Sequence, residues 1–242
     1  MVKACGASDL AAWDQVNCYC ERAFSPDFWA EPLNAMSNLA FIVAAVMIYA
    51  DLRSSRVTAG RKRILSLIVL LMIVGAGSFL FHTYATAWSR FADITPIAVF
   101  VAVYTVLALR WFLGLGAVLS ILFSVFVVGL TVAMFVFGSA LNGSLAYVPG
   151  LLSMLVVGTW LHRRGHGATD WILSAFCVFA LSLAFRTIDG WPEASPLGCL
   201  VREADGRTVA MGTHPLWHLL NAVTLYLLLR AAILYPPATR KS

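Results

Sequence analysis

Long apolar runs are the feature of this sequence that most restricts its fold. About 20 apolar residues are needed to cross the ~30 Å hydrocarbon layer of a bilayer as a helix, and several runs approach that length. Only helices and closed barrels satisfy all of their backbone hydrogen bonds inside a membrane. We therefore expect spanning helices at roughly residues 33–50, 64–84, 91–110, 115–137, 144–161, 171–187 and 214–233.

The composition excludes a soluble globular protein. Of the 242 residues, 60% are hydrophobic and 12% are charged, whereas soluble domains carry about 25% charged residues. The net charge of +5 does not indicate a nucleic-acid partner, because the basic residues lie in short loops between apolar runs. We predict an all-α integral membrane bundle of seven transmembrane helices. It forms a single membrane domain over residues 1–242, with an N-terminal segment at 1–32, the helices at 33–233 and a tail at 234–242.

The basic residues also predict how the bundle is oriented. Arginine and lysine concentrate in the loops 51–63 and 162–170 and in the C-terminal tail. Short loops rich in these residues stay in the cytoplasm. We therefore expect the N-terminus outside and the C-terminus in the cytoplasm, with a short outer turn near Ser89 and a longer outer loop at 188–213. Compact loops favour a bacterial inner membrane, whose outer side is periplasmic.

Four of the five cysteines fall on the predicted outer side. Cys5, Cys18 and Cys20 lie in the N-terminal segment, Cys199 lies in the last outer loop, and Cys177 lies within a span. An even number of outer cysteines suits an oxidising compartment. The favoured bridge, between Cys20 and Cys199, would hold the ends of the first and last helices together. Pairing cannot be deduced from sequence alone, so free thiols are the alternative.

A small set of polar residues in the predicted spans can carry chemistry. They are Ser78, His82, Asp93, His214 and His218, all near the outer ends of their helices. Ionisable groups inside a membrane are costly and are usually functional or paired. Ser78 and His82 are four residues apart, as are His214 and His218, so each pair shares one helix face. Three imidazoles that leave a fourth position to water are typical of catalytic zinc. The alternative is that each histidine is a hydrogen-bonded packing residue.

A zinc ion held by these three histidines would support hydrolysis. Zinc lowers the pKa of bound water toward ~7 and polarises a carbonyl group. Ser78 is then expected to hydrogen-bond the oxyanion or the activated water. Asp93 is expected either to orient that water or accept its proton, or instead to fix one imidazole. Thr213 is expected to cap the last helix, with Pro215 in its first turn. A substrate that reaches such a site from the bilayer is a lipid.

The order and spacing of these residues resemble the alkaline ceramidase family. That family belongs to a superfamily of seven-helix hydrolases that includes the adiponectin receptors. The resemblance extends from Cys20 to the last helix. It is carried by Gly77, Ser78, Phe81 and His82, by Asp93 before Pro96, and by the run from His214 to His218; Glu31, Asn34, Ser37 and Asn38 also resemble the segment that enters the first helix of the family.

The resemblance implies an activity. It implies zinc at the three histidines, assistance from Ser78 and Asp93, and hydrolysis of the N-acyl amide of ceramide-type lipids to a sphingoid base and a fatty acid. It also implies the disulfide between Cys20 and Cys199.

The resemblance is weaker for calcium. Animal members of the family bind calcium near the N-terminus through an acidic cluster, and Glu21 and Glu31 are the matching candidate oxygen ligands. Arg22 interrupts this stretch, which argues against calcium. The alternative is that Glu21 or Glu31 pairs with Arg22 or caps the first helix.

Other functions remain open at this point. The same residues suit a hydrolase of another lipid amide or ester. The superfamily also allows a receptor-like protein with zinc in a mainly structural role, although a structural ion needs neither Ser78 nor Asp93. A transporter is disfavoured because its ionisable groups would lie deeper in the membrane or on broken helices.

Overall fold

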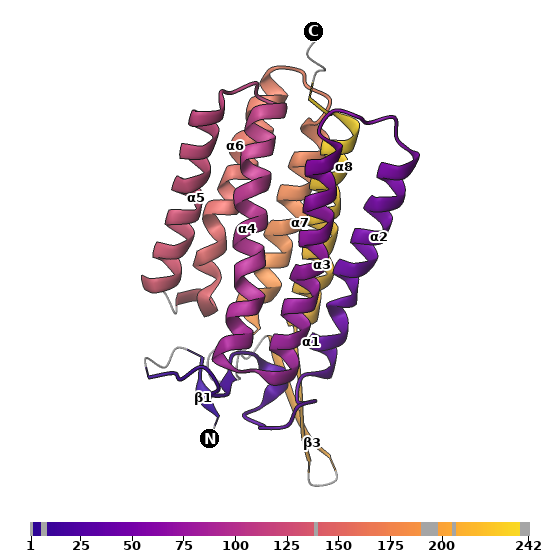
Figure 1. Cartoon of the computed structure of the whole chain (residues 1–242). Coiled ribbons are helices and arrows are strands. Elements are labelled where there is room, and N and C mark those ends of the chain that lie inside the picture. Colours follow the sequence, from indigo (N-terminus) through magenta and orange to yellow (C-terminus); the bar gives the residue numbers. More distant parts are fainter. Residues whose placement is uncertain (1, 6–8, 138–139, 190–197, 205–206, 238–242) are drawn as a thin grey trace.

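The protein is a bundle of membrane-length helices. A computed structural model describes residues 2–5, 9–137, 140–189, 198–204 and 207–237. Within these residues, seven helical segments are long and apolar enough to cross a membrane, which confirms the predicted all-α seven-helix bundle (Figure 1). The first span comprises α1 (Pro32–Ser37) and α2 (Leu39–Ser54), and the others are α3 (Arg61–Tyr84), α4 (Ala87–Trp111), α5 (Ala117–Phe137), α6 (Val148–Arg163, after the 3-10 helix η2 at Ala140–Tyr147), α7 (Thr169–Ile188) and α8 (His214–Leu234).

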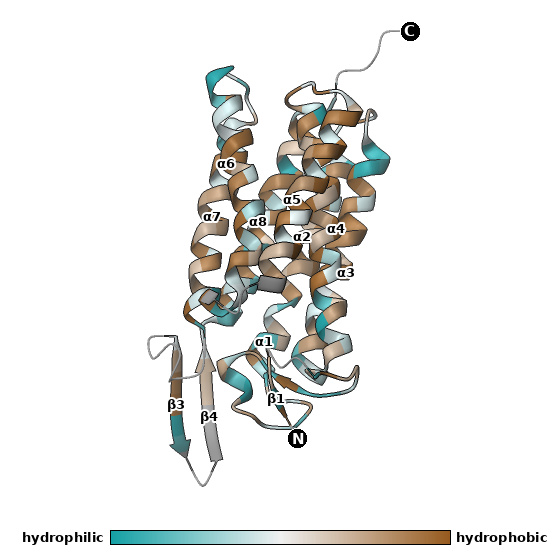
Figure 2. Ribbon diagram, turned by 90° about the vertical axis from the view of Figure 1, so that its left-hand side faces the viewer, coloured by the Kyte–Doolittle hydropathy of each residue, from teal (hydrophilic) through white to brown (hydrophobic). Residues whose placement is uncertain are grey.

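The core and the surface of the bundle are both apolar. Buried side chains from α2, α3, α4, α6, α7 and α8 form one continuous cluster. Helix α5 lies at the edge, and its Val118, Leu122 and Val125 are all more than 60% exposed. Figure 2 shows hydrophobic residues along the length of the helices and hydrophilic residues near their ends. Such a surface is stable against lipid rather than water.

Short extramembrane elements cover one end of the bundle. They are β1 (Lys3–Ala4), paired in parallel with β2 (Val16–Asn17), and the antiparallel hairpin of β3 (Cys199–Ala204) and β4 (Arg207–Gly212). The C-terminal end of α8 lies at the opposite end (Figure 1). Disulfides join Cys5 to Cys18 and Cys20 to Cys199, so the expected bridge between the N-terminal segment and the last loop is present.

The structure adjusts two local predictions and adds one element. The turn expected near Ser89 lies at Ala85 and Thr86, because α3 ends at Tyr84 and α4 begins at Ala87. Thr86 and Ser89 form a reciprocal capping box that starts α4 before its apolar run. Thr213 is the N-cap residue of α8 and Pro215 lies in its first turn, as expected, but the Thr213 hydroxyl group makes no capping hydrogen bond and donates instead to the carbonyl oxygen of Phe185. The β3–β4 hairpin was expected only as a loop. Residues 238–242 of the expected tail lie outside the described residues.

Candidate active site

Three histidines come together at the covered end of the bundle. His82 lies in the last turn of α3, and His214 and His218 lie in the first two turns of α8. Each is at most 1% exposed, and their candidate ligand atoms lie within 4.8 Å of one another. No other group of three histidine, cysteine or acidic side chains is this close in the described part of the chain. The two helical pairs therefore converge as their spacing predicts.

The imidazoles are held so that ring nitrogens are left for a ligand. Nδ1 of His82 hydrogen-bonds Oε2 of Glu31 at 2.6 Å, and Nδ1 of His218 hydrogen-bonds Oγ of Ser37 at 2.7 Å. The ring of Tyr19 stacks on that of His214, with centroids 3.7 Å apart. Nε2 of His82 and Nδ1 of His214 are buried without a hydrogen-bond partner among the described residues. Metal-binding histidines usually have their second nitrogen fixed in this way, so the site fits a metal ion.

Glu31 is fixed from both sides. Its Oε1 accepts a hydrogen bond from Nε of Arg22 at 2.6 Å, and its Oε2 accepts one from Nδ2 of Asn34 at 3.0 Å. Burial alone would raise the pKa of Glu31, but His82 and Arg22 hold it below its usual value. The Arg22 guanidinium also donates to the carbonyl oxygen of His82 at 3.3 Å. Glu31 is therefore an anchored carboxylate beside the metal-binding candidate His82.

The two carboxylates considered for calcium have protein partners. Leu33 and Asn34 lie in the first turn of α1. Their backbone amides donate hydrogen bonds to Glu21 at 2.7 and 2.8 Å. Burial raises the pKa of Glu21 despite these two bonds. Glu31 pairs with Arg22. These contacts match the alternative interpretation of the sequence, while calcium binding itself stays a prediction.

Ser78 and Asp93 lie next to a tight contact between α3 and α4. A side chain on Gly77 would overlap the carbonyl oxygen of Ala92. That carbonyl belongs to the residue four before Pro96, which has no N–H to donate to it. The close approach brings the Ser78 hydroxyl group near the Asp93 carboxyl group and to 3.5 Å from Nε2 of His218. Both side chains are buried, so the predicted assisting pair lies beside the histidines.

Asp189 links Cys20, a cysteine of the second disulfide, to the start of α8. Its Oδ1 accepts a hydrogen bond from the backbone amide of His214 at 2.9 Å, and its Oδ2 accepts one from that of Cys20 at 3.3 Å. Burial raises the pKa of Asp189 to about 6, although these amides oppose the shift. Asp189 thus supplies the side-chain acceptor for the first turn of α8 that Thr213 does not supply. Its position in the outer loop expected at 188–213 gave no sign of this role.

An apolar cavity of about 520 Å³ lies next to residues that adjoin the site: none of Ser78, Asp93 and the three histidines lines it, but Ile94, which follows Asp93, does. It is lined by residues of α4 to α8, among them Phe91, Phe135, Tyr147, Phe179 and Asn221. Asn221 is buried and lies one turn after His218 on α8. Along α4 the cavity extends from Phe91 to Thr105, or about 21 Å at 1.5 Å per residue. Its length and lining suit a hydrocarbon chain.

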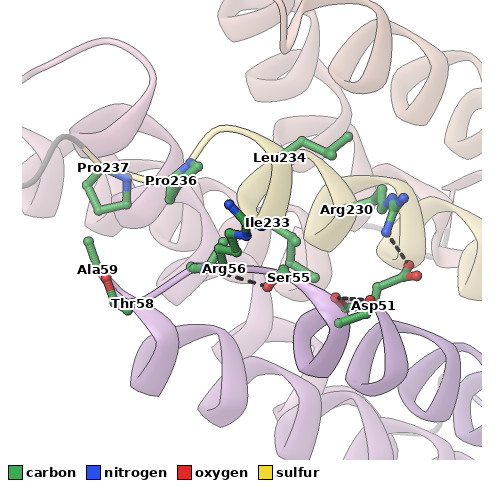
Figure 3. A pocket seen from close by; sticks show the side chains of 12 residues that line it. Asp51, Ser55, Arg56, Thr58, Ala59, Arg230, Ile233, Leu234, Pro236 and Pro237 are labelled. Atoms are coloured by element: carbon green, nitrogen blue, oxygen red, sulfur yellow. Dashed lines mark hydrogen bonds and ion pairs between the residues drawn. The ribbon is translucent and has the colours of Figure 1, made fainter.

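A second pocket, at the opposite end of the bundle, is not part of the site. It has a volume of about 510 Å³ and lies between the loop after α2 and the C-terminal end of α8 (Figure 3). Arg230 and Asp51 form an ion pair there at 2.7 Å. Its lining comes from residues 51–59 and 230–237, at the end of the bundle away from the histidines (Figure 1).

Comparison with known proteins agrees with the geometry. A family model described as ceramidase matches residues 16–239. This range includes the three histidines, Ser78, Asp93 and both cysteines of the bridge between Cys20 and Cys199. A search of curated proteins finds no match. Because the family model covers nearly the whole chain, the chain belongs to the ceramidase family.

Proposed function

We propose that the protein hydrolyses the N-acyl amide of ceramide-type lipids to a sphingoid base and a fatty acid. The observation that carries the proposal is the cluster of three buried histidines, whose candidate ligand atoms lie within 4.8 Å of one another in a ceramidase-family chain. We assign zinc to His82, His214 and His218, because a nitrogen-only set of three ligands is typical of catalytic zinc. When bound, zinc would supply a Lewis acid that polarises the amide carbonyl and acidifies water.

The protein side chains keep the site in its reactive geometry. Glu31 and Ser37 fix the rings of His82 and His218 through their Nδ1 atoms, and Tyr19 supports the ring of His214 by stacking. These contacts hold the imidazoles in single orientations, so little reorganisation is needed when the substrate binds.

Ser78 and Asp93 are the proposed catalytic residues. Ser78 donates a hydrogen bond to the amide carbonyl oxygen as negative charge develops on it. Asp93 accepts the proton of the attacking water and delivers it to the leaving amine nitrogen. Glu31 and Ser37 already occupy Nδ1 of two of the histidines. This favours the proton-transfer role for Asp93 over the role of fixing an imidazole.

The lipid would reach the site from the bilayer. The cavity between α4 and α8 suits the acyl chain, and the amide then lies at the histidine end near the head groups. We propose that the chain is a single membrane domain and that this end lies on the outer, periplasmic side of a bacterial inner membrane. The two disulfides support an oxidising compartment at that end.

Zinc content and fatty-acid release test the proposal together. Detergent-purified wild type is expected to carry about one zinc, by the three-histidine pattern, and to release fatty acid from ceramides. His82→Ala and His218→Ala should lose both, while Asp93→Ala should keep zinc and lose turnover. His162→Ala is the matched control, since His162 is exposed in the last turn of α6, at the end of the bundle away from the three histidines.

The outcomes separate the competing functions. Zinc without cleavage of any ceramide would favour another lipid substrate or a receptor-like role. Fatty-acid release that survives the loss of His82 and His218 would overturn the site assignment.

A further inference from the structure

Arg186 is a buried cation in the last turn of α7. It is 9% exposed. Its Nη1 donates to the carbonyl oxygen of Asn142 at 2.7 Å and to Oγ of Ser144 at 2.9 Å. The guanidinium lies over the ring of Tyr147, 4.9 Å from its centroid, and 5.8 Å from the ring centroid of Trp217. All of these partners are neutral.

The charge of Arg186 has no carboxylate partner within ion-pair distance among the described residues; the Asp93 carboxylate interacts with it only from a longer distance. Its Nε is also buried without a hydrogen-bond partner there. Arg22 provides a comparison, because it is even more deeply buried, at 1% exposed, but pairs with Glu31 at 2.6 Å. A buried charge without a counterion is strongly unfavourable, and aromatic faces compensate only part of that cost. The surroundings of Arg186 therefore suit an anionic ligand.

Arg186 does not itself line the apolar cavity, but it is connected by contacts both to the cavity and to the histidines. Tyr19, whose hydroxyl group is close enough to interact with the guanidinium, stacks on His214. Tyr147, on whose ring the guanidinium lies, lines the cavity. An acyl chain in the cavity would thus have its carboxyl end near both Arg186 and the histidines.

We propose that Arg186 binds the carboxylate of a long-chain fatty acid whose hydrocarbon chain occupies this cavity. This inference rests on the proposed function, in which the water oxygen bonds to the acyl carbon, the C–N bond breaks and the amine leaves with a proton. The neutral amide then becomes a carboxylate, so a negative charge forms near the guanidinium of Arg186. Arg186 therefore binds the product more tightly than the substrate, and fatty acid inhibits the enzyme competitively.

Binding of a radiolabelled long-chain fatty acid to immobilised, detergent-solubilised protein tests this directly. Arg186→Gln should weaken binding by about tenfold or more, because it removes a charge-assisted hydrogen bond. Arg186→Lys keeps the charge and should bind better than Arg186→Gln. Arg90→Gln is the matched control, since Arg90 is half-buried and lies 5.0 Å over the ring of Phe135, another cavity residue. It should bind like wild type.

The fatty alcohol of the same length provides a test on the wild type alone. It fills the cavity but lacks the charge, so it should compete at least about tenfold less well than the acid, by the same hydrogen-bond reasoning. Equal competition by acid and alcohol, or unchanged binding in Arg186→Gln, would overturn the proposal.

The same measurement on His82→Ala protein, which has no turnover, separates this inference from the proposed function. If fatty-acid binding depends on Arg186 but the wild type cleaves no ceramide, the proposed carboxylate site is supported and the proposed reaction is contradicted.

Discussion

The contact between Glu31 and His82 allows a quantitative test of the metal centre. Replacing Glu31 with glutamine keeps the shape of the side chain but leaves one acceptor oxygen where there were two. The wild-type carboxylate hydrogen-bonds Arg22 at 2.6 Å through one oxygen, and His82 at 2.6 Å and Asn34 at 3.0 Å through the other. The single oxygen of glutamine can face only one of these two sides. In either orientation an N–H group faces another donor. We therefore expect zinc affinity to fall by about 10- to 100-fold, or about 1.4–2.8 kcal/mol.

The assay is competition between the metal-free protein and a zinc-binding indicator in detergent. Glu21→Gln is the control, because Glu21 is also a buried carboxylate of this segment but hydrogen-bonds only the backbone amides of Leu33 and Asn34. It should keep the affinity of wild type. Unchanged affinity in Glu31→Gln, or an equal loss in both variants, would refute the idea that Glu31 orients His82 for the metal.

Three further predictions follow from contacts around the site. Gly77→Ala should push α4 away from α3 at Ala92, destabilise the protein by about 1–3 kcal/mol and lower kcat while zinc content stays unchanged; normal kcat would contradict it. Cys199→Ser should destabilise the covered end by about 2–5 kcal/mol, read as a lower Tm than for Cys177→Ser, the control at a free, exposed cysteine. Glu21→Gln removes a carboxyl group whose pKa is raised by burial. The wild-type carboxyl therefore favours folding below its unfolded pKa of about 4.3, and this advantage is lost as pH rises through the folded value. The Tm of wild type minus that of Glu21→Gln should fall with pH, and a constant difference would contradict the assignment.

The sequence predicted the bundle and the metal-binding candidates because both depend on patterns within single helices. Apolar runs locate the spans, and the spacing of four residues puts His214 and His218 on one face of α8. The boundaries were less certain because caps are set by individual side chains. The capping residue Thr86 makes α4 begin before its apolar run begins. The first turn of α8 is held by Asp189, 25 residues before His214, which accepts a hydrogen bond from the His214 backbone amide.

The supporting residues could not be assigned from the sequence because they act through contacts between distant segments. Glu31 was considered as a calcium ligand, and only the fold reveals that it hydrogen-bonds His82, which is 51 residues away. Ser37 belongs to a noted run, yet its bond to His218 spans 181 residues. Arg186 gave no signal, because a single arginine at the end of a span looks like an interfacial anchor.

The split of the site between the two ends of the chain has a consequence for biosynthesis. His82 belongs to the second span, whereas His214 and His218 belong to the last. The bridge between Cys20 and Cys199 joins cysteines 179 residues apart. During synthesis, therefore, neither the proposed metal site nor this bridge can form until nearly all of the chain has left the ribosome. If the proposed function holds, unfinished chains cannot attack lipids of the membrane into which they are being inserted.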